Sequence, residues 1–400
     1  MSEPAHVPEA EKFDAAKLGG LPNNLLIAGV VGLALTALGA FVIGKEQFAY
    51  TYLFAFAFFF TVILGAAFWN CLHHATDSEW SVVIRRQIEN VASLFPYLFI
   101  LFLPLLGCAG ILWKWWNIPP GVDSLLDAKQ PYLSQWFFLL RVALYFGVVS
   151  LVVMALRGNS TKQDADGQSA RSFAMRKLGI GGIPAVALTI TFAGFDWLMG
   201  LDYHWFSTMW GVYLFAGAAG SSMSLIVIIV TALKDRGYLK VVNDEHYHIM
   251  GKFMLAFTIF WAYIGFSQYM LIWYANIPEE TVYYIIRNQG NWVILSTLLV
   301  VGRFFLPFPI LLTQWVKKHP HRLRYVAIWI IVMQVLDIFV IVIPTFRKTG
   351  FGFVDVAYSI CPLVGIGGIL GWLFFKRRLT QGYLFPTKDP RLGASIKLHN

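Results

Sequence analysis

Ten long apolar runs constrain what this 400-residue chain can fold into. Each is long enough to cross about 30 Å of hydrocarbon at about 1.5 Å per helical residue. Backbone groups find no water inside a bilayer, so spanning segments must be helices or closed barrel strands, and the alternating pattern of barrel strands is absent. The runs are Leu25–Ile43, Phe48–Leu72, Val91–Trp113, Trp136–Leu156, Ile180–Leu198, Phe206–Leu233, Phe253–Tyr274, Trp292–Leu312, Tyr325–Ile343 and Val354–Phe375. We therefore predict an all-α polytopic membrane protein with ten transmembrane helices.

The composition supports this class and excludes others. Hydrophobic residues make up 58% of the chain and charged residues only 13%, against about 25% charged residues in a usual soluble domain. A water-soluble protein of this size cannot bury so much apolar surface. A soluble enzyme, a disordered chain and a secreted disulfide scaffold are therefore excluded.

Lysine and arginine are distributed unevenly between the two ends of the predicted helices. Ten spans put both termini on one side, and that side holds 23 of these residues against 6 on the other. Basic loops stay in the cytoplasm, so the N-terminal tail (1–23) and the C-terminal tail (376–400) are predicted to be cytoplasmic. Basic loops beside an anionic leaflet also explain the net charge of +9 without nucleic acid as a partner.

The positions of cysteine and histidine argue against a cofactor held by this chain. Cys71, Cys108 and Cys361 lie far apart, without the CxxC spacing typical of iron–sulfur or zinc sites. All nine histidines fall in tails, loops or span ends, whereas a membrane b-type haem needs axial histidines on facing helices at buried depth. We therefore predict no metal and no cofactor in this chain itself.

The turn between the fifth and sixth runs carries more polar side chains than a short connection needs. Asp196 ends an apolar run, where an ionised carboxylate is costly unless it is paired. Asp202 and His204 follow it in the same turn. Three interpretations stay open: acids that cap the next helix, a proton-handling or quinone-facing acid, and a contact for a partner on that side.

A second group of titratable residues follows the second run on the predicted cytoplasmic side. His73 and His74 are adjacent, so on a helix they point about 100° apart and rarely bind one metal. Asp77 and Glu79 resemble a capping sequence for the helix that leads into the third run. The group is therefore a helix cap with surface salt bridges, a cytoplasmic proton entrance or, as a third alternative, a metal site.

Arg303 and Asp337 lie inside the eighth and ninth runs. Counted from the non-cytoplasmic ends of these runs at 1.5 Å per residue, Arg303 lies about 16 Å deep and Asp337 about 9 Å deep. A short loop makes the two helices antiparallel neighbours, and an unpaired charge at such depth is costly. We predict that the two side chains interact, either to lock two helices together or to gate an outer proton half-channel.

Three segments resemble the NrfD-like family, the polytopic subunits related to the polysulfide reductase membrane anchor. They are the turn from Phe195 to Thr208, the run from His73 to Asn90 and the stretch from Gln268 to Glu280. Within this family the chain is similar to the two paralogous membrane subunits of alternative complex III, a bacterial quinol:cytochrome c oxidoreductase. Quinol oxidation is usually placed in one of these two subunits, and the chain looks most like the other. The resemblance covers nearly the whole chain.

The resemblance implies two four-helix bundles, at about 48–198 and 206–343, flanked by helices 25–43 and 354–375. It implies a cofactor-free subunit of the bacterial cytoplasmic membrane that contributes to quinone interaction, to proton translocation coupled to electron transfer, or to both. Haem c and iron–sulfur clusters are expected in periplasmic partner subunits. A paralogous NrfD-like subunit and membrane lipids are expected as further neighbours.

The titratable residues named above are then candidates for a proton pathway. They are His73, His74, Asp77 and Glu79 on the inner side, Asp196, Asp202 and His204 on the outer side, and Arg303 and Asp337 within the spans. Two other classes of function fit the same pattern of spans and buried charges. One is a stand-alone secondary transporter, and the other is a purely structural membrane scaffold.

Overall fold

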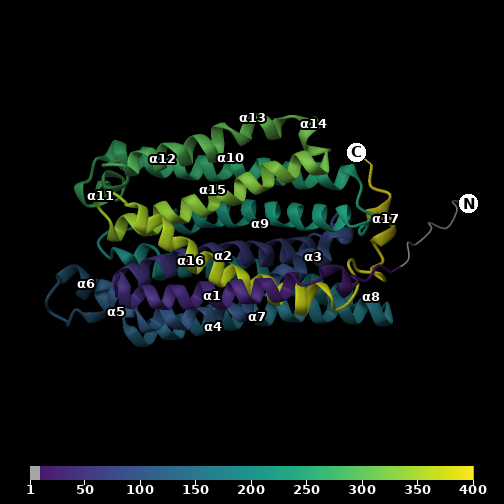
Figure 1. Ribbon diagram of the computed structural model, residues 1–400, viewed down its shortest axis with the longest axis horizontal. Coiled ribbons are helices and arrows are strands. Elements are labelled where there is room, and N and C mark those ends of the chain that lie inside the picture. The colour runs from purple at the N-terminus through teal and green to yellow at the C-terminus, as the bar shows by residue number, and fades with distance from the viewer. Residues whose placement is uncertain (1–9, 400) are drawn as a thin grey trace, which may run out of the picture.

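The computed structural model describes residues 10–399, which are built of helices and contain no β-strand. Ten helical stretches of this range are long and apolar enough to cross a membrane. They lie side by side along the long axis of the molecule (Figure 1). The prediction of an all-α polytopic membrane protein is confirmed. Residues 1–9 of the predicted N-terminal tail, and Asn400, lie outside the described residues.

The observed helices overlap the predicted apolar runs, but α7 extends to Asp166, α8 begins at Ser169 and α10 at Asp244, all well beyond the apolar runs at the same end. The spanning elements are α1 (Leu21–Val42), α2 (Lys45–Ala75), α3 (Val82–Ala92) with α4 (Phe95–Gly107), α7 (Gln135–Asp166), α8 (Ser169–Trp197), α9 (Trp210–Asp235), α10 (Asp244–Ala275), α12 (Trp292–Val300) with η4 (Val301–Phe305) and α13 (Pro307–Leu312), α15 (Pro320–Phe346), and α16 (Phe353–Leu373) with η5 (Phe374–Leu379). Shorter helices lie between the spans, α5 (Ala109–Leu112), α6 (Ser124–Lys129), α11 (Pro278–Arg287) and α14 (Gln314–Lys317), and one follows the last span, α17 (Leu392–Ile396).

Two ends of the molecule can be told apart in Figure 1. Helices α5, α6 and α11 gather at one end, called the outer end below. Helices α14 and α17 lie at the opposite end, called the inner end, together with the C-terminus. The first described residues are at the inner end too, because the carbonyl of Glu11 accepts a hydrogen bond from Leu384 N at 2.9 Å.

The third span differs from the predicted run, Val91–Trp113. It begins at Val82 and ends at Gly107, with a break between α3 and α4. The start of this span cannot be recognised from hydropathy, because charged residues such as Arg86 and Glu89 interrupt the apolar pattern. These two side chains are buried and pair with each other at 2.9 Å, which offsets part of the cost of burying their charges.

The helices fall into two groups of contacting neighbours. α2, α4, α7 and α8 contact one another, as do α9, α10, α13 and α15, and α2 meets α9 between the groups. α1 packs along α16, and both touch α2. α2 and α9 are buried over most of their surface, and most of the side chains that they bury are apolar.

Small residues let α2 and α9 approach closely at the centre of the molecule. A Cβ atom added at Gly65 on α2 would lie 2.2 Å from the backbone oxygen of Ala218 on α9. One turn away, the indole Nε1 of Trp69 donates a hydrogen bond to the Ala219 carbonyl at 2.9 Å. Backbone cannot move aside as a flexible side chain can, so this contact fixes the separation of the two helices.

We expect Gly65→Ala to destabilise the protein by roughly 1–3 kcal/mol, because the new methyl group overpacks a backbone contact. The matched control is Gly147→Ala on α7, where an added Cβ meets nothing within 4 Å. In the interior of a helix that change should instead stabilise by about 0.5–1 kcal/mol. Thermal unfolding in detergent measures both variants, and equal effects of the same sign would contradict the prediction.

The C-terminal segment is folded, although 376–400 is predicted as a tail. Residues 376–379 continue the last span as η5. Leu384 and Phe385 are fully buried beside α3, and the side-chain amide of Gln87 donates to the Leu384 carbonyl at 2.7 Å. The hydroxyl of Ser395 on α17 donates to the Trp80 carbonyl at 3.0 Å. The segment therefore covers the inner end of the third span.

Candidate functional site

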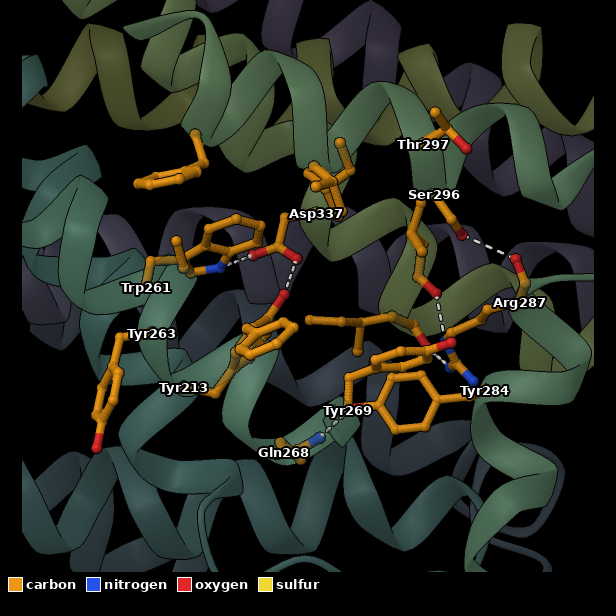
Figure 2. Close-up of a pocket in the computed structure, with 18 of the residues that line it drawn as sticks. Tyr213, Trp261, Tyr263, Gln268, Tyr269, Tyr284, Arg287, Ser296, Thr297 and Asp337 are labelled. Atoms are coloured by element: carbon orange, nitrogen blue, oxygen red, sulfur yellow. Dashed lines mark hydrogen bonds between the residues drawn. The ribbon is translucent and has the colours of Figure 1, made fainter. Parts of the chain in front are cut away.

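A cavity of about 650 Å³ lies between α9, α10, α11, α12, η4 and α15. Figure 2 shows the side chains that converge on it from these elements. Ten of the 24 lining residues are aromatic: Trp210, Tyr213, Trp261, Tyr263, Phe266, Tyr269, Tyr283, Tyr284, Phe304 and Phe305. Only a few polar groups interrupt this lining, which is the usual composition of a small-molecule site.

The cavity opens through the side of the molecule. Tyr263 and Phe266 on α10, and Val300 and Phe305 on the opposite wall, line it and are largely exposed. These residues belong to helices apolar enough to span a membrane. Exposed apolar residues at such depth face hydrocarbon, so the mouth of the cavity opens toward lipid.

Asp337 on α15 forms part of the cavity wall and is almost fully buried. The hydroxyl of Tyr213 donates to its Oδ1 atom at 2.5 Å, and the indole Nε1 of Trp261 donates to Oδ2 at 3.2 Å. Both contacts are visible in Figure 2. The carboxylate thus stands at the edge of an otherwise aromatic space, held by donors from two other helices.

The structure shows the predicted contact between Arg303 and Asp337. Nη1 of Arg303 donates to Oδ2 of Asp337 at 2.8 Å, and both side chains are buried. The guanidinium also lies over the Trp261 ring, 4.5 Å from its centroid, and donates to the side chain of Gln334. The amide of Gln334 in turn lies 3.4 Å from the hydroxyl of Thr61 on α2. The pair is therefore tied to both helix groups.

A π-helical turn positions Arg303. Pro307 has no N–H to donate to the carbonyl four residues earlier, so the regular helical ladder is interrupted here. Leu306 N instead donates to the carbonyl of Val301 at 2.9 Å, a π-type bond. The displaced carbonyl of Gly302 accepts a hydrogen bond from the Trp329 indole at 2.6 Å. Such bulges recur at functional positions in helices.

Arg287, at the end of α11, closes the outer wall of the cavity. Its guanidinium donates to the carbonyls of Val340 at 2.9 Å and Ile341 at 2.6 Å, and lies 3.4 Å from the Tyr283 ring centroid. Pro344 in α15 leaves the Val340 carbonyl without its helical donor. Burial lowers the pKa of Arg287. Sequence reasoning missed this residue by counting it as a loop charge.

Asp196 is also paired, in the other group of helices. Nε and Nη2 of Arg141 on α7 each donate to its carboxylate at 2.8 Å, and the Tyr145 hydroxyl donates at 2.7 Å. Each group has four spans, and in each the arginine lies on the third of the four and the aspartate on the fourth. The pairs are Arg141 on α7 with Asp196 on α8, and Arg303 on η4 with Asp337 on α15. The two groups therefore repeat one arrangement of charges.

Asp202 and His204 lie together in the outer turn, apart from Asp196. Nδ1 of His204 is 3.6 Å from Asp202, and its Nε2 is 3.4 Å from Asp123 before α6. The Tyr203 hydroxyl donates to Asp123 at 2.8 Å, which lowers the pKa of that carboxyl. Burial, together with this bond, raises the pKa of Tyr203 to about 12. Among the described residues, no hydrogen bond or ion pair joins this group to Asp196.

The inner residues separate into a buried and an accessible set. His73 and His74 are buried at the end of α2, and Nε2 of His74 is 3.9 Å from Glu89 on α3. Asp77 is only half-buried and pairs with arginines of α8 and the C-terminal segment, while Glu79 is exposed. The structure therefore brings His74 to Glu89 instead of to Asp77 and Glu79, and it packs His73 against Trp69 and Trp80.

A buried polar cluster surrounds Glu89, and sequence reasoning missed it because α3 reads as a loop. Its members, the inner polar cluster below, are His73, His74, Arg85, Arg86 and Glu89. Both ring nitrogens of each histidine, and one oxygen of Glu89, have no hydrogen-bond partner among the described residues. Buried polar atoms need such partners, and ordered water is the usual one where protein groups are missing.

Among residues 10–399, no three His, Cys, Asp or Glu side chains are placed to hold a metal ion. Neither a known protein-family model nor a curated protein matches the chain.

Proposed function

We propose that this chain is the membrane subunit of a quinol-oxidising respiratory complex of the alternative complex III type, and that it binds the quinone in the cavity beside Asp337. The observation that carries the proposal is a lipid-facing aromatic cavity with one buried carboxylate in its wall. A quinol reaches its enzyme through the bilayer, so a mouth in the lipid-facing surface suits it.

The cavity matches the chemistry of a quinone head group. Aromatic walls stack against a planar ring, and about 650 Å³ lies within the range of small-molecule sites. The carboxylate of Asp337 and the hydroxyl oxygen of Tyr213 offer acceptors for a quinol hydroxyl on one side, and Gln268 adds an amide whose Nε2 donates to the Tyr284 hydroxyl at 3.0 Å. An isoprenoid tail would leave through the mouth into lipid.

Asp337 and the inner polar cluster provide groups that can handle protons. A quinol gives up two protons with its two electrons, and a carboxylate at the cavity wall can accept one of them. From Asp337, contacts continue through Arg303 and Gln334 to Thr61. Water at the inner polar cluster would extend a path toward the inner end. The electrons would pass to haem c and iron–sulfur clusters in partner subunits.

The proposed setting is the bacterial cytoplasmic membrane, with the inner end toward the cytoplasm and a paralogous NrfD-like subunit and periplasmic redox subunits as partners. Cysteine labelling tests this orientation in a background whose three native cysteines are replaced by serine. Val122→Cys lies at the outer end and Gln381→Cys at the inner end, and both positions are exposed. We expect an impermeant reagent to label Val122→Cys in intact cells and Gln381→Cys only after permeabilisation. The reverse pattern would refute the orientation.

Filling the mouth of the cavity tests quinone binding. Val300 on α12 lines the cavity, whereas Val293 on the same helix is similarly exposed but lies outside the lining. A short-chain quinone should quench the fluorescence of Trp210 and Trp261 in the purified protein. We expect Val300→Phe to weaken this binding at least about tenfold and Val293→Phe to leave it unchanged.

Two other outcomes would point to the rival classes of function. Purification of the chain alone, with binding of a polar solute but no quinone, would favour a secondary transporter. Retention of full quinol turnover by an assembled Val300→Phe complex would favour a structural scaffold. Co-purification with haem-containing subunits, together with loss of turnover in Val300→Phe only, is the result that the proposal requires.

A further inference from the structure

A second hollow lies on the opposite group of helices, at the inner end. It is a groove of about 480 Å³ between α4, α7 and η5. Its floor is apolar, formed by Pro96 and Tyr97 on one side and Leu151 and Met154 on the other. Leu151 is 74% exposed within a spanning helix, so the groove faces lipid.

One charged residue lines this groove. The guanidinium of Arg378 is held in place by a hydrogen bond from Nη2 to the Ser93 carbonyl at 3.0 Å and lies 5.6 Å from the Tyr97 ring centroid. Its Nε atom is buried and has no hydrogen-bond partner among the described residues. A buried N–H group needs a hydrogen-bond acceptor, and the described residues supply none for Nε of Arg378.

The surrounding charge is positive. Lys376 and Arg377 precede Arg378 on η5 and are exposed, and none of the three forms an ion pair within residues 10–399. A further cation, Arg157 on α7, lies near enough for the charge of Arg378 to act on it. The acidic groups near Arg157, Glu89 and Asp164, are already paired with Arg86.

We propose that this groove binds one anionic phospholipid, with the phosphate on Arg378 and one acyl chain along Leu151 and Met154. A basic pocket between spanning helices at the membrane surface is the arrangement that recognises anionic head groups. The groove accounts for the acyl chain, and the anchored guanidinium accounts for the phosphate. A zwitterionic lipid offers the same chain but cancels the charge on which the recognition depends.

Native mass spectrometry of the full-length protein, dosed with phosphatidylglycerol or phosphatidylcholine after mild delipidation, tests the proposal. We expect one phosphatidylglycerol to be retained in preference to phosphatidylcholine. Arg378→Gln should lower that retention at least about fivefold, whereas Lys252→Gln, which removes one exposed inner charge on α10, should not.

A second variant separates a lipid from a free phosphate. Leu151→Trp fills the groove but leaves Arg378 in place, and should also reduce phosphatidylglycerol retention. Soluble glycerophosphoglycerol, the head group without acyl chains, should not compete at matched concentration. Three results would each overturn the proposal. The protein could retain both lipids equally, Arg378→Gln could retain phosphatidylglycerol as the native protein does, or the soluble head group could bind and still bind in Leu151→Trp.

Discussion

Replacing Asp337 with asparagine is expected to destabilise the protein by about 3–5 kcal/mol, because it strands the buried guanidinium of Arg303 without its counter-charge. Asparagine keeps one oxygen, which can accept either from Tyr213 or from Trp261 and Arg303, so the change removes the charge together with the hydrogen bonds on one side. The double variant Arg303→Gln with Asp337→Asn removes both charges and should lose less. Thermal unfolding and the monodisperse fraction in mild detergent measure the difference.

The matched control for this experiment is Asp202→Asn. Asp202 is half-buried in the outer turn, where its histidine contact is partly exposed to solvent, so its loss should change stability by no more than about 0.5 kcal/mol. A single variant as stable as the native protein, or a double variant less stable than the single one, would contradict the role of the ion pair.

Turnover of the assembled Asp337→Asn complex separates the two interpretations of this pair. If Arg303 and Asp337 only lock two helices, the fraction that assembles should oxidise quinol at the native rate. If Asp337 accepts a proton from quinol in the cavity, that fraction should lose most of its turnover. Either result would leave the stability prediction unaffected, because it rests on the buried charge alone.

The sequence was sufficient for the spanning helices because apolar length is the property that a bilayer selects. It was also sufficient for the contact between Arg303 and Asp337, since two lone charges on consecutive helices need partners at similar depth. The same argument applies to Arg141 and Asp196, which lie on consecutive spans near the outer end. The sequence therefore carries the same signal for the second pair.

The inner polar cluster and the cavity could not be read from hydropathy. α3 contains Arg85, Arg86 and Glu89 yet is buried along its whole length, so a hydropathy window scores it as a loop. Its burial depends on the C-terminal segment, which lies about 300 residues away in sequence and returns to cover it. The cavity arises because side chains of six elements leave one space between them unfilled, and no local sequence pattern predicts such a space.

Asp389 makes the contact that holds the C-terminal segment over α3. It is almost fully buried and pairs with Arg85 and Arg391. Burial by itself would raise the pKa of this carboxyl, but the two arginines hold it well below its usual range. A depressed pKa contributes stability above the unfolded value of about 3.9, and that stability is lost only as the pH falls through the lower folded value. The contribution of Asp389 to closure should therefore be insensitive to pH between about 5 and 8.

We expect Asp389→Asn to destabilise closure of the segment by roughly 3 kcal/mol across that pH range. The loss lies at the low end for a buried pair because Arg85 keeps Glu89 within 3.6 Å. Hydrogen exchange should then accelerate in α17 and in the amides of α3. The control is Asp166→Asn, whose pair with Arg171 is about a quarter exposed and should contribute no more than about 1 kcal/mol. Unchanged exchange in α3 of the Asp389→Asn variant would show that apolar packing of Leu384 and Phe385 alone keeps the segment in place.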